Sequence, residues 1–539
     1  MTDFILPQLA AQAAPEFVDA PSARAWLEVL PLANVAAAQH QMLLQLEEFN
    51  RYATSASARL ETLETLREAA HFVQIEQAKR FTHRALPIEP VEARIFQETI
   101  DLWEQFRVGY LRCLEAAAGR NDPGMREKAG LLCQRALAYT GLKMFHHHRA
   151  YRYVPDIEWR NLHRVYAVAE RLGVPEQAVK DYLNRDVHDT SARIAYIRAV
   201  LMGIANPNEL SQRQLTFVAF LLERWADKVR VSRTPIDEEG VPPLVADLAS
   251  AARPSRDGVA AAEPRYLDAL QLGKTLRNRV GLLRRGESPA KLALGEDCVQ
   301  PSCEQLLTQL YRHWLQPRAA RAHERKRSEG TVHACQGMSA IYFHIAGQPF
   351  REPGGKSVLS KQEADQLATF GHLSARGDAA LPRGEDILLE EWQVEDDSAL
   401  GVKIMRRAGH GGRRYMHLQL VALRHKAAGQ FSLGQVRWLM QSENDDLFLG
   451  IRTLPGLPKA MAARPSATSA GGVKDRFVPG LSLTAVPEQQ APATLILPSG
   501  WYRPNRLIDV FVEETKQVRL LEFLDRGSDF ERLTYEAVR

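Results

Sequence analysis

The sequence predicts a multidomain α+β protein in which an all-α N-terminal half is followed by a β-barrel and a further small β-unit. Runs rich in Leu, Ala, Glu and Arg, with apolar residues three and four positions apart, fill roughly the first 230 residues, and this spacing favours helices. Short runs rich in Val, Ile, Leu and aromatic residues, separated by Gly, Asn, Asp and Lys, occupy much of the C-terminal part and favour β-strands. A chain of 539 residues is long enough for several domains.

The expected helices follow one another closely along the N-terminal half. They are Ala23–Val29, Leu43–Arg51, Ala56–Arg80, Pro90–Ala117, Gly124–Ala138, Trp159–Leu172, Ile194–Ala205 and Gln212–Val229. In one of them, the spacing of Trp159, Leu162 and Tyr166 resembles the first helix of a tetratricopeptide repeat. No second copy follows at a period of about 34 residues. We therefore expect a helical bundle or an irregular solenoid that is repeat-like only in part.

Proline, glycine and charge content suggests where these parts meet. The expected divisions are a helical domain at 1–231, an irregular linker at 232–263, a helical connector at 264–318, a β-barrel at 319–455 with an insertion at 348–391, an irregular segment at 456–492, and a C-terminal β-unit at 493–539. The expected barrel strands lie in the runs Thr331–Phe343, Trp392–Glu395, Val402–Met405, Tyr415–Leu423, Phe431–Leu439 and Leu447–Leu454.

The composition is that of an ordinary soluble protein, with 45% hydrophobic and 25% charged residues. A net charge of +4 over this length is too small to indicate DNA binding. No run approaches 18 uncharged apolar residues, so no transmembrane helix is expected. The N-terminus lacks the basic and apolar regions of a secretory signal. Five scattered cysteines suit a reducing compartment, and these features together predict a cytoplasmic protein without membrane insertion.

Candidates for metal binding and catalysis fail on spacing. Cys298 and Cys303 are the only close pair of cysteines, and no second pair completes a zinc site. The consecutive histidines His146–His148 would point about 100° apart on a helix, so they cannot converge on one ion and are expected to be structural or solvated. No Gly-x-Ser-x-Gly, His-Glu-x-x-His or paired catalytic carboxylates stand out. The sequence predicts neither an enzyme nor a metal site.

Two short motifs in the barrel region carry the ligand chemistry. Arg321 and Arg325 form an Arg-x-x-x-Arg, and Asp396, Ser398 and Gly401 form an Asp-x-Ser-x-x-Gly between two expected strands. Paired guanidiniums can bind phosphates or the guanine edge and can stack on purine rings. An Asp/Ser turn offers acceptors to guanine N–H groups, and a glycine lets backbone approach a ligand closely. The pair of motifs therefore favours an anionic ligand with planar bases.

In this order and context, the two motifs resemble the signature of PilZ domains, the small β-barrels that bind cyclic di-GMP in bacteria. The resemblance covers about residues 315–455, and the runs Gly434–Leu439 and Leu449–Ile451 look like the closing strands of such a barrel. It implies that cyclic di-GMP is bound by Arg321, Arg325, Asp396, Ser398 and Gly401, with Arg318, Arg327 and Arg406 as possible secondary contacts. PilZ proteins generally control pili, flagella, surface attachment or exopolysaccharide. The resemblance thus implies a signalling receptor without a cofactor, and we expect the helical domain to bind a protein partner.

One departure from the PilZ pattern keeps an alternative open. Arg325 and Asp396 are 71 positions apart, longer than the usual gap, and the excess fits the insertion at 348–391. If the insertion displaces the arginines, the barrel is degenerate and the protein is a ligand-independent scaffold. The arginines could also be a solvated basic helix end, and Asp396 and Ser398 could be simple turn formers.

Overall fold

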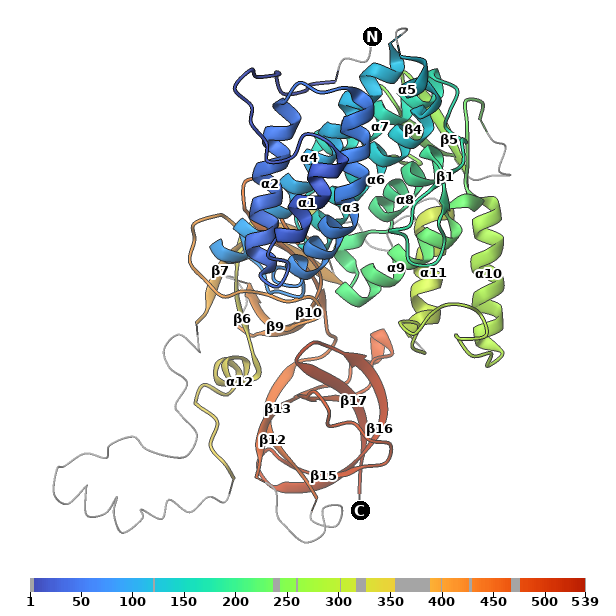
Figure 1. Cartoon of the computed structure of the whole chain (residues 1–539). Helices are drawn as coiled ribbons and strands as arrows, with labels where there is room; N and C mark the ends of the chain where they lie inside the picture. Colours follow the sequence, from blue (N-terminus) through green and yellow to red (C-terminus); the bar gives the residue numbers. More distant parts are fainter. Residues whose placement is uncertain are drawn as a thin grey trace, which may run out of the picture. The chain divides into compact units, whose positions relative to one another are not determined.

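The chain folds as two compact units, one mostly helical and one mostly β (Figure 1). A computed structural model of the protein describes residues 4–119, 122–235, 243–257, 260–300, 302–316, 326–353, 388–398, 400–425, 429–466 and 476–538. Unit 1 comprises Met1–Arg84 and Ile88–Ala320, and unit 2 comprises Ala85–Pro87 and Arg321–Arg539. Among the described residues, no helix is both long enough and apolar enough to cross a membrane.

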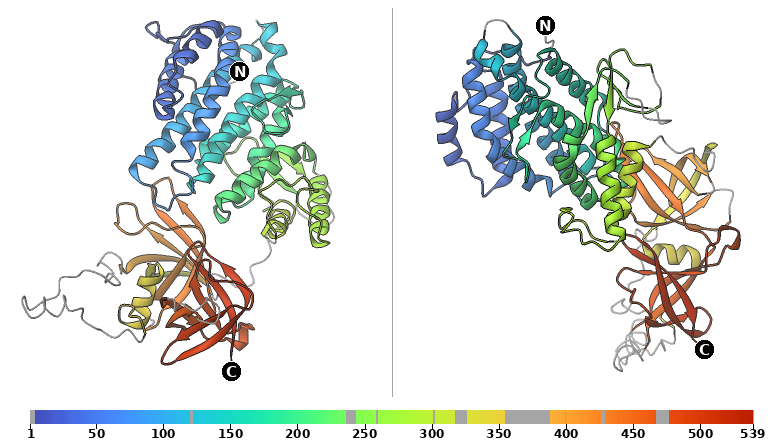
Figure 2. Two further views of the ribbon diagram at one scale, coloured as in Figure 1. Left: turned by 60° about the horizontal axis from the view of Figure 1, so that its bottom comes forward. Right: turned by 90° about the vertical axis from the view of Figure 1, so that its right-hand side faces the viewer.

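Unit 1 is an array of helices that stack side by side, coloured blue to green in Figures 1 and 2. The helices are α1 (Ala20–Val29), α2 (Val35–Arg51), α3 (Ala56–Ala78), α4 (Pro90–Ala118), α5 (Pro123–Glu127), α6 (Ala129–Arg149), α7 (Asp156–Arg171), α8 (Ala192–Ile204), α9 (Gln212–Trp225), α10 (Leu270–Arg284) and α11 (Ser302–Leu315). Side chains of Ser55, Ser191 and Ser211 accept hydrogen bonds from first-turn N–H groups, so polar N-caps set where these helices begin. Between α4 and α6, Trp103, fully buried, packs 5.4 Å from the ring of Tyr139.

Two small sheets also belong to unit 1. The strands β1 (Val179–Lys180) and β2 (Asp189–Thr190) pair with each other, and β3 (Arg230–Ser232), β4 (Leu244–Asp247) and β5 (Pro264–Asp268) form a sheet in the order β3-β5-β4. The expectation of an irregular linker at 232–263 is therefore wrong around β4, and the connector that follows begins with a strand. The sequence does not reveal these strands, because they are too short to show an alternation of apolar and polar residues and prolines lie close to them. Cys298 and Cys303, the close cysteine pair, form a disulfide at the start of α11, so the expectation of scattered, reduced cysteines is not met for this pair.

The first barrel of unit 2, here called barrel 1, is a closed sheet of six antiparallel strands. Its strands are β6 (Lys326–Gln336), β7 (Glu390–Ser398), β8 (Gly401–Arg406), β9 (Leu420–His425), β10 (Ser432–Gln441) and β11 (Leu447–Thr453), in the order β10-β11-β8-β7-β6-β9. The expected strand Thr331–Phe343 is only half correct. It bends at Gly337, which has a φ of 83°, and continues as helix α12 (Met338–Ala346).

The C-terminal β-unit is a second closed barrel, barrel 2, seen as a red ring in Figure 1. Its strands are β12 (Pro458–Pro465), β13 (Val478–Leu483), β14 (Thr494–Pro498), β15 (Leu507–Phe511), β16 (Thr515–Arg526) and β17 (Phe530–Ala537), in the order β12-β13-β14-β17-β16-β15. Residues 456–492 are therefore not all irregular, because they supply β12 and β13. The prolines that suggested a loop stand at strand positions such as Pro458 and Pro465, at the two ends of β12.

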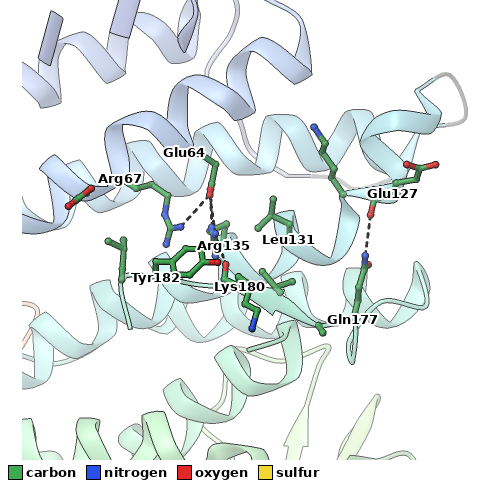
Figure 3. Close-up of a pocket in the computed structure, with 13 residues that line it drawn as sticks. Glu64, Arg67, Glu127, Leu131, Arg135, Gln177, Lys180 and Tyr182 are labelled. Carbon is green, nitrogen blue, oxygen red and sulfur yellow. Dashed lines mark hydrogen bonds and ion pairs between the residues drawn. The ribbon is translucent and has the colours of Figure 1, made fainter. Parts of the chain in front are cut away.

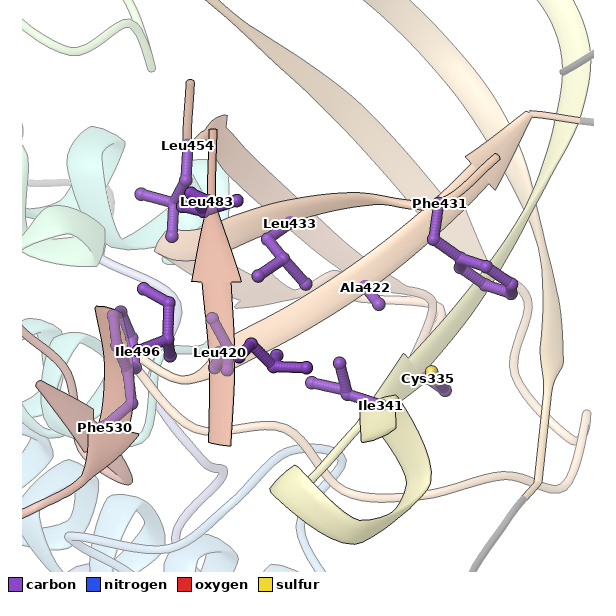
Figure 4. Close-up of a cluster of buried hydrophobic side chains, with 11 residues drawn as sticks. Cys335, Ile341, Leu420, Ala422, Phe431, Leu433, Leu454, Leu483, Ile496 and Phe530 are labelled. Atoms are coloured by element: carbon purple, nitrogen blue, oxygen red, sulfur yellow. The ribbon is translucent and has the colours of Figure 1, made fainter. Parts of the chain in front are cut away.

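One hydrophobic core is formed by residues of both barrels (Figure 4). Leu420, Leu433 and Leu454 from barrel 1 pack with residues of barrel 2, and Ile341 of α12 joins them. The residues from barrel 2 are Leu481, Leu483, Ile496 and Phe530. Backbone bonding adds to this junction, since the N–H of Leu420 donates to the Asp529 carboxylate at 2.9 Å. The predicted fold class, a helical N-terminal part followed by a β-barrel and a further β-unit, is confirmed.

Candidate ligand-binding site

The Asp-x-Ser-x-x-Gly motif forms the tight turn of the β7–β8 hairpin. Ser398 pairs with Gly401 across the hairpin, and the Ser398 hydroxyl donates to the Gly401 carbonyl at 2.9 Å. This bond fixes the turn and leaves the lone pairs of the hydroxyl oxygen as acceptors. Gly401 is required by packing within the barrel, because a Cβ there would lie 2.3 Å from the Ile451 carbonyl oxygen. The sequence predicts that this glycine lets a ligand approach the backbone. In the structure the backbone that it approaches closely is that of strand β11.

Strand register places Asp396 in a row of residues that crosses the outer face of barrel 1. Asp396 pairs with Lys403 on β8, Lys403 with Gly450 on β11, and Gly450 with Trp438 on β10. Residues directly opposite each other in an antiparallel pair point to the same side of the sheet. The inward-facing neighbours Val402 and Ile404 are buried. The row therefore carries a carboxylate, an ammonium group and an indole on one surface.

Trp438 lies flat on this surface because its neighbour has no side chain. A Cβ on Gly450 would stand 1.9 Å from the indole nitrogen of Trp438, so only glycine lets the ring cover strand β11. The indole is half-buried, and one face of it is thereby supported by the sheet. Next to it, the Lys403 ammonium lies 4.9 Å from the ring centroid of Phe448 and 3.7 Å from the Glu395 carboxylate. A supported aromatic ring beside a cation is a surface suited to a nucleobase.

The arginine motif leads directly into the strand beside the Asp-x-Ser turn. Arg318, Arg321 and Arg325 lie outside the described residues. The next residue, Lys326, begins β6 and pairs with Asp397, and Arg327 pairs with Asp396. The 71 positions between the motifs thus do not keep the start of β6 away from the turn. Most of the insertion expected at 348–391 also lies outside the described residues.

Arg406, expected as a possible secondary contact, points into barrel 1. Its side chain is 6% exposed and forms an ion pair with Glu390 at 2.5 Å, while Nη2 donates to the Arg413 carbonyl at 2.9 Å. Its guanidinium also lies 4.9 Å from the Trp392 ring centroid. These partners occupy the guanidinium, and we interpret Arg406 as a structural residue.

Two family models match this chain on either side of barrel 1. The model described as "Cyclic-di-GMP receptor FimW, N-terminal domain" matches residues 21–236, and the "FimW C-terminal beta-barrel domain" matches residues 462–538. Together they cover more than half of the chain. The chain belongs to the FimW family.

A FimW relative gives the same assignment over a longer region. The cyclic-di-GMP receptor FimW of Pseudomonas aeruginosa is 27% identical over 360 residues, which is 64% of this chain and 56% of that protein. The matched region thus spans little more than half the length of that relative. The FimW N-terminal domain corresponds to most of unit 1, and the FimW C-terminal domain corresponds to barrel 2. Neither model covers 237–461, which includes barrel 1 and the candidate site.

The FimW N-terminal domain of this chain has a recess of about 630 Å³ beside α3 and α6 (Figure 3). At its floor Arg135 donates to both carboxylate oxygens of Glu64 at 2.9 and 3.0 Å, and Arg67 donates to Asp181 at 2.8 Å. Burial raises the pKa of Asp181, but the guanidiniums of Arg67 and Arg135 outweigh it and lower that pKa below its ordinary value. These charges satisfy one another, so we interpret the floor as a structural network.

Within the described residues, no group of His, Cys, Asp and Glu side chains could hold a metal ion. His146–His148 lie on α6 and are buried. Burial lowers the pKa of His147 to about 4 and that of His148 to about 3. Of the residues that form the candidate surface, Trp438, Lys403 and Gly450 were not expected from the sequence. An isolated glycine inside a strand, as in Leu449-Gly-Ile451, is the signal that could have pointed to them.

Proposed function

We propose that this protein is a receptor for cyclic di-GMP, bound on the outer face of barrel 1 and acting without catalysis. The single observation that carries the proposal is the register Arg327–Asp396–Lys403, which places the strand that follows the arginine motif beside the Asp-x-Ser turn. The FimW family assignment supports the same ligand. The proposal includes Arg321 and Arg325 because the sequence resembles the PilZ signature at these positions.

Each group has a chemical counterpart in the ligand. The guanidiniums of Arg321 and Arg325 would bind phosphate oxygens and guanine O6 and N7. The Asp396 carboxylate would accept hydrogen bonds from the guanine N1–H and N2–H groups, and the Trp438 ring would stack on a base. An adenine dinucleotide lacks the guanine O6 and N2 groups, so the site should discriminate against cyclic di-AMP.

The helical unit would pass the signal to a protein partner, as expected for a bacterial receptor that couples a soluble dinucleotide to cell-surface behaviour. The FimW relative's name identifies a cyclic-di-GMP receptor and supports the ligand, while the partner is proposed from the size and helical character of unit 1. In this proposal the protein works in the cytoplasm.

The proposal is tested by calorimetric titration of the full chain with cyclic di-GMP. Arg321→Ala and Arg325→Ala should each weaken binding by about 2–4 kcal/mol, because each removes a charge-assisted contact. Arg407, exposed on the loop after β8, provides the matched control, and Arg407→Ala should bind as wild type does. Thermal unfolding of all three variants should match wild type within about 0.5 kcal/mol, because the proposal gives Arg321 and Arg325 a role in ligand binding and Arg407 is exposed. If the wild-type chain shows no heat of binding in the titration, the receptor function is excluded and the ligand-independent scaffold function is favoured.

A further inference from the structure

A short segment from the N-terminal half of the chain belongs to unit 2 and is bound to the loop between β8 and β9 of barrel 1. The chain leaves unit 1 after Arg84, contributes Ala85–Pro87 to unit 2, and returns to unit 1 at Ile88, shortly before α4. Leu86 forms an antiparallel bridge with Tyr415, with N–H···O distances of 2.8 and 2.7 Å. We call Ala85–Pro87 the strap. Because the strap lies between α3 and α4, its position is linked through the chain to the two helices.

The strap is bound by side chains of the loop between β8 and β9 in addition to this backbone bridge. Arg414 donates from Nε and Nη2 to the Ala85 carbonyl at 2.9 and 2.6 Å. Leu86 is 1% exposed and Tyr415 is fully buried. Tyr415 packs edge-on against Trp392, with centroids 5.2 Å apart and an interplanar angle of 87°. The strap is therefore bound to the β8–β9 connection of barrel 1 and belongs to unit 2.

The loop that carries Arg414 and Tyr415 is tied to the far ends of the β7–β8 hairpin. Glu390, the first residue of β7, accepts from the Arg413 N–H at 2.6 Å and pairs with Arg406, the last residue of β8. Arg406 in turn donates to the Arg413 carbonyl. The loop backbone packs closely on this ion pair, because a Cβ on Gly412 would lie 2.2 Å from Nη1 of Arg406 and 2.8 Å from the Glu390 carboxylate.

The β7–β8 hairpin therefore connects the candidate ligand site with the loop that binds the strap. Its turn carries Asp396 and Ser398, and its open end carries the Glu390–Arg406 pair that fixes the strap-binding loop. Paired strands move together, since a relative shift would break the hydrogen bonds between them. A displacement of the turn on ligand binding would then reach the strap through two strands and one buried ion pair.

We propose that the strap is the link through which ligand binding at the β7–β8 turn alters the helical unit, with Arg414 and Tyr415 as its anchor on barrel 1. The inference rests on the proposed function and adds how that function is coupled to the part of the chain that would meet a partner. A ligand shifts such an equilibrium only if it binds the two states differently, and the hairpin provides the contact that differs.

Hydrogen exchange of the full chain with and without cyclic di-GMP tests the strap. In wild type and in the control Arg407→Ala, the ligand should change the exchange of amides in α3 and α4 next to the strap. Arg414→Ala removes the two side-chain hydrogen bonds to Ala85 and so weakens the anchor. This variant should still bind cyclic di-GMP in a titration, but the ligand should change exchange in these helices much less than in wild type. A second variant inserts four glycines between Arg84 and Ala85. It keeps the barrel contacts and slackens the connection, and it should lose the response in α3 in the same way.

The outcomes separate the strap from the receptor function. A ligand-dependent change in α3 and α4 that survives in both Arg414→Ala and the glycine insertion overturns the strap and leaves the receptor in place. Binding by wild type without any change in α3 and α4 overturns it too. A wild-type chain that does not bind in the titration contradicts the proposed function itself, and the strap with it. If Arg414→Ala does not fold, the glycine insertion decides alone: a response in α3 that survives the insertion overturns the strap, and its loss supports the strap.

Discussion

At the scale of the residue, position in the barrel decides which side chains of similar chemistry are available to a ligand. Arg406 belongs to a basic stretch, yet it is buried against Glu390 and Trp392. Trp438 looks like an ordinary strand residue, yet Gly450 lets its ring lie on the outer face. Residue types predict an anionic, planar ligand for this region. Strand register was needed to separate structural residues from candidate contacts.

Trp438 gives a prediction that belongs to a single side chain. Trp438→Ala should weaken cyclic di-GMP binding by about 1–3 kcal/mol, the usual contribution of one base stacked on an aromatic ring. Trp438→Phe keeps a ring above Gly450 and should recover most of the affinity. Calorimetric titration measures both variants. Equal affinities for the alanine and phenylalanine variants would show that the indole does not stack on the ligand.

The sequence could predict the turn residues of the site but not the surface around them. Asp396, Ser398 and Gly401 are close in the chain, so their spacing alone indicates a turn. Lys403 and Trp438 come close to them only because strands pair across barrel 1. A single sequence does not show which residues of different strands lie opposite each other. The binding role of Arg321 and Arg325 stays a prediction.

At the scale of the element, long helices were predictable and short strands were not. Helices such as α4 repeat their apolar spacing over many turns and begin with clear caps, so periodicity identifies them. Strands such as β12 and β13 are short, contain proline or glycine, and gain their stability from barrel closure. The sequence predicts a strand where α12 lies, because a run of apolar and β-branched residues does not distinguish a buried helix from a buried strand.

Helix α6 gives a prediction about pH. Burial lowers the pKa of His147 to about 4 and of His148 to about 3, below the ordinary value of 6.5. Below that value the unfolded chain binds more protons than the folded chain, so stability is complete above about pH 6.5 and falls as the pH is lowered towards these pKa values. Each histidine should cost about 1.4 kcal/mol per pH unit within this window.

Thermal melts between pH 7.5 and 5.0 measure this loss. His148→Phe keeps a buried ring and removes a proton site, so its melting temperature should fall less steeply with pH than that of wild type. His40, on α2, is exposed and offers a control, because His40→Phe should leave the slope unchanged. Identical slopes for wild type and His148→Phe would mean that protonation of His148 does not limit acid stability.

At the scale of the whole molecule, unit 2 is stabilised as one body because its two barrels bury residues against each other. Ile341 of α12 and Leu420 and Leu433 of barrel 1 pack with residues of barrel 2 in one core (Figure 4). These residues of barrel 2 include Leu483 and Phe530. The candidate site therefore depends on a barrel that carries none of the ligand motifs.

Phe530 tests this dependence in the full chain. It is fully buried in the shared core, and Phe530→Ala should cost about 3–5 kcal/mol through lost burial and the cavity left behind. Because the core is common, hydrogen exchange should speed up in β9 and β10 of barrel 1 as well as in β14 and β17 of barrel 2. Tyr535, on the same strand, packs against the core that belongs to barrel 2 alone, so Tyr535→Ala should act mainly within barrel 2. If Phe530→Ala left the exchange of β9 and β10 unchanged, the barrels would unfold independently, and a role for barrel 2 in holding the site would be excluded.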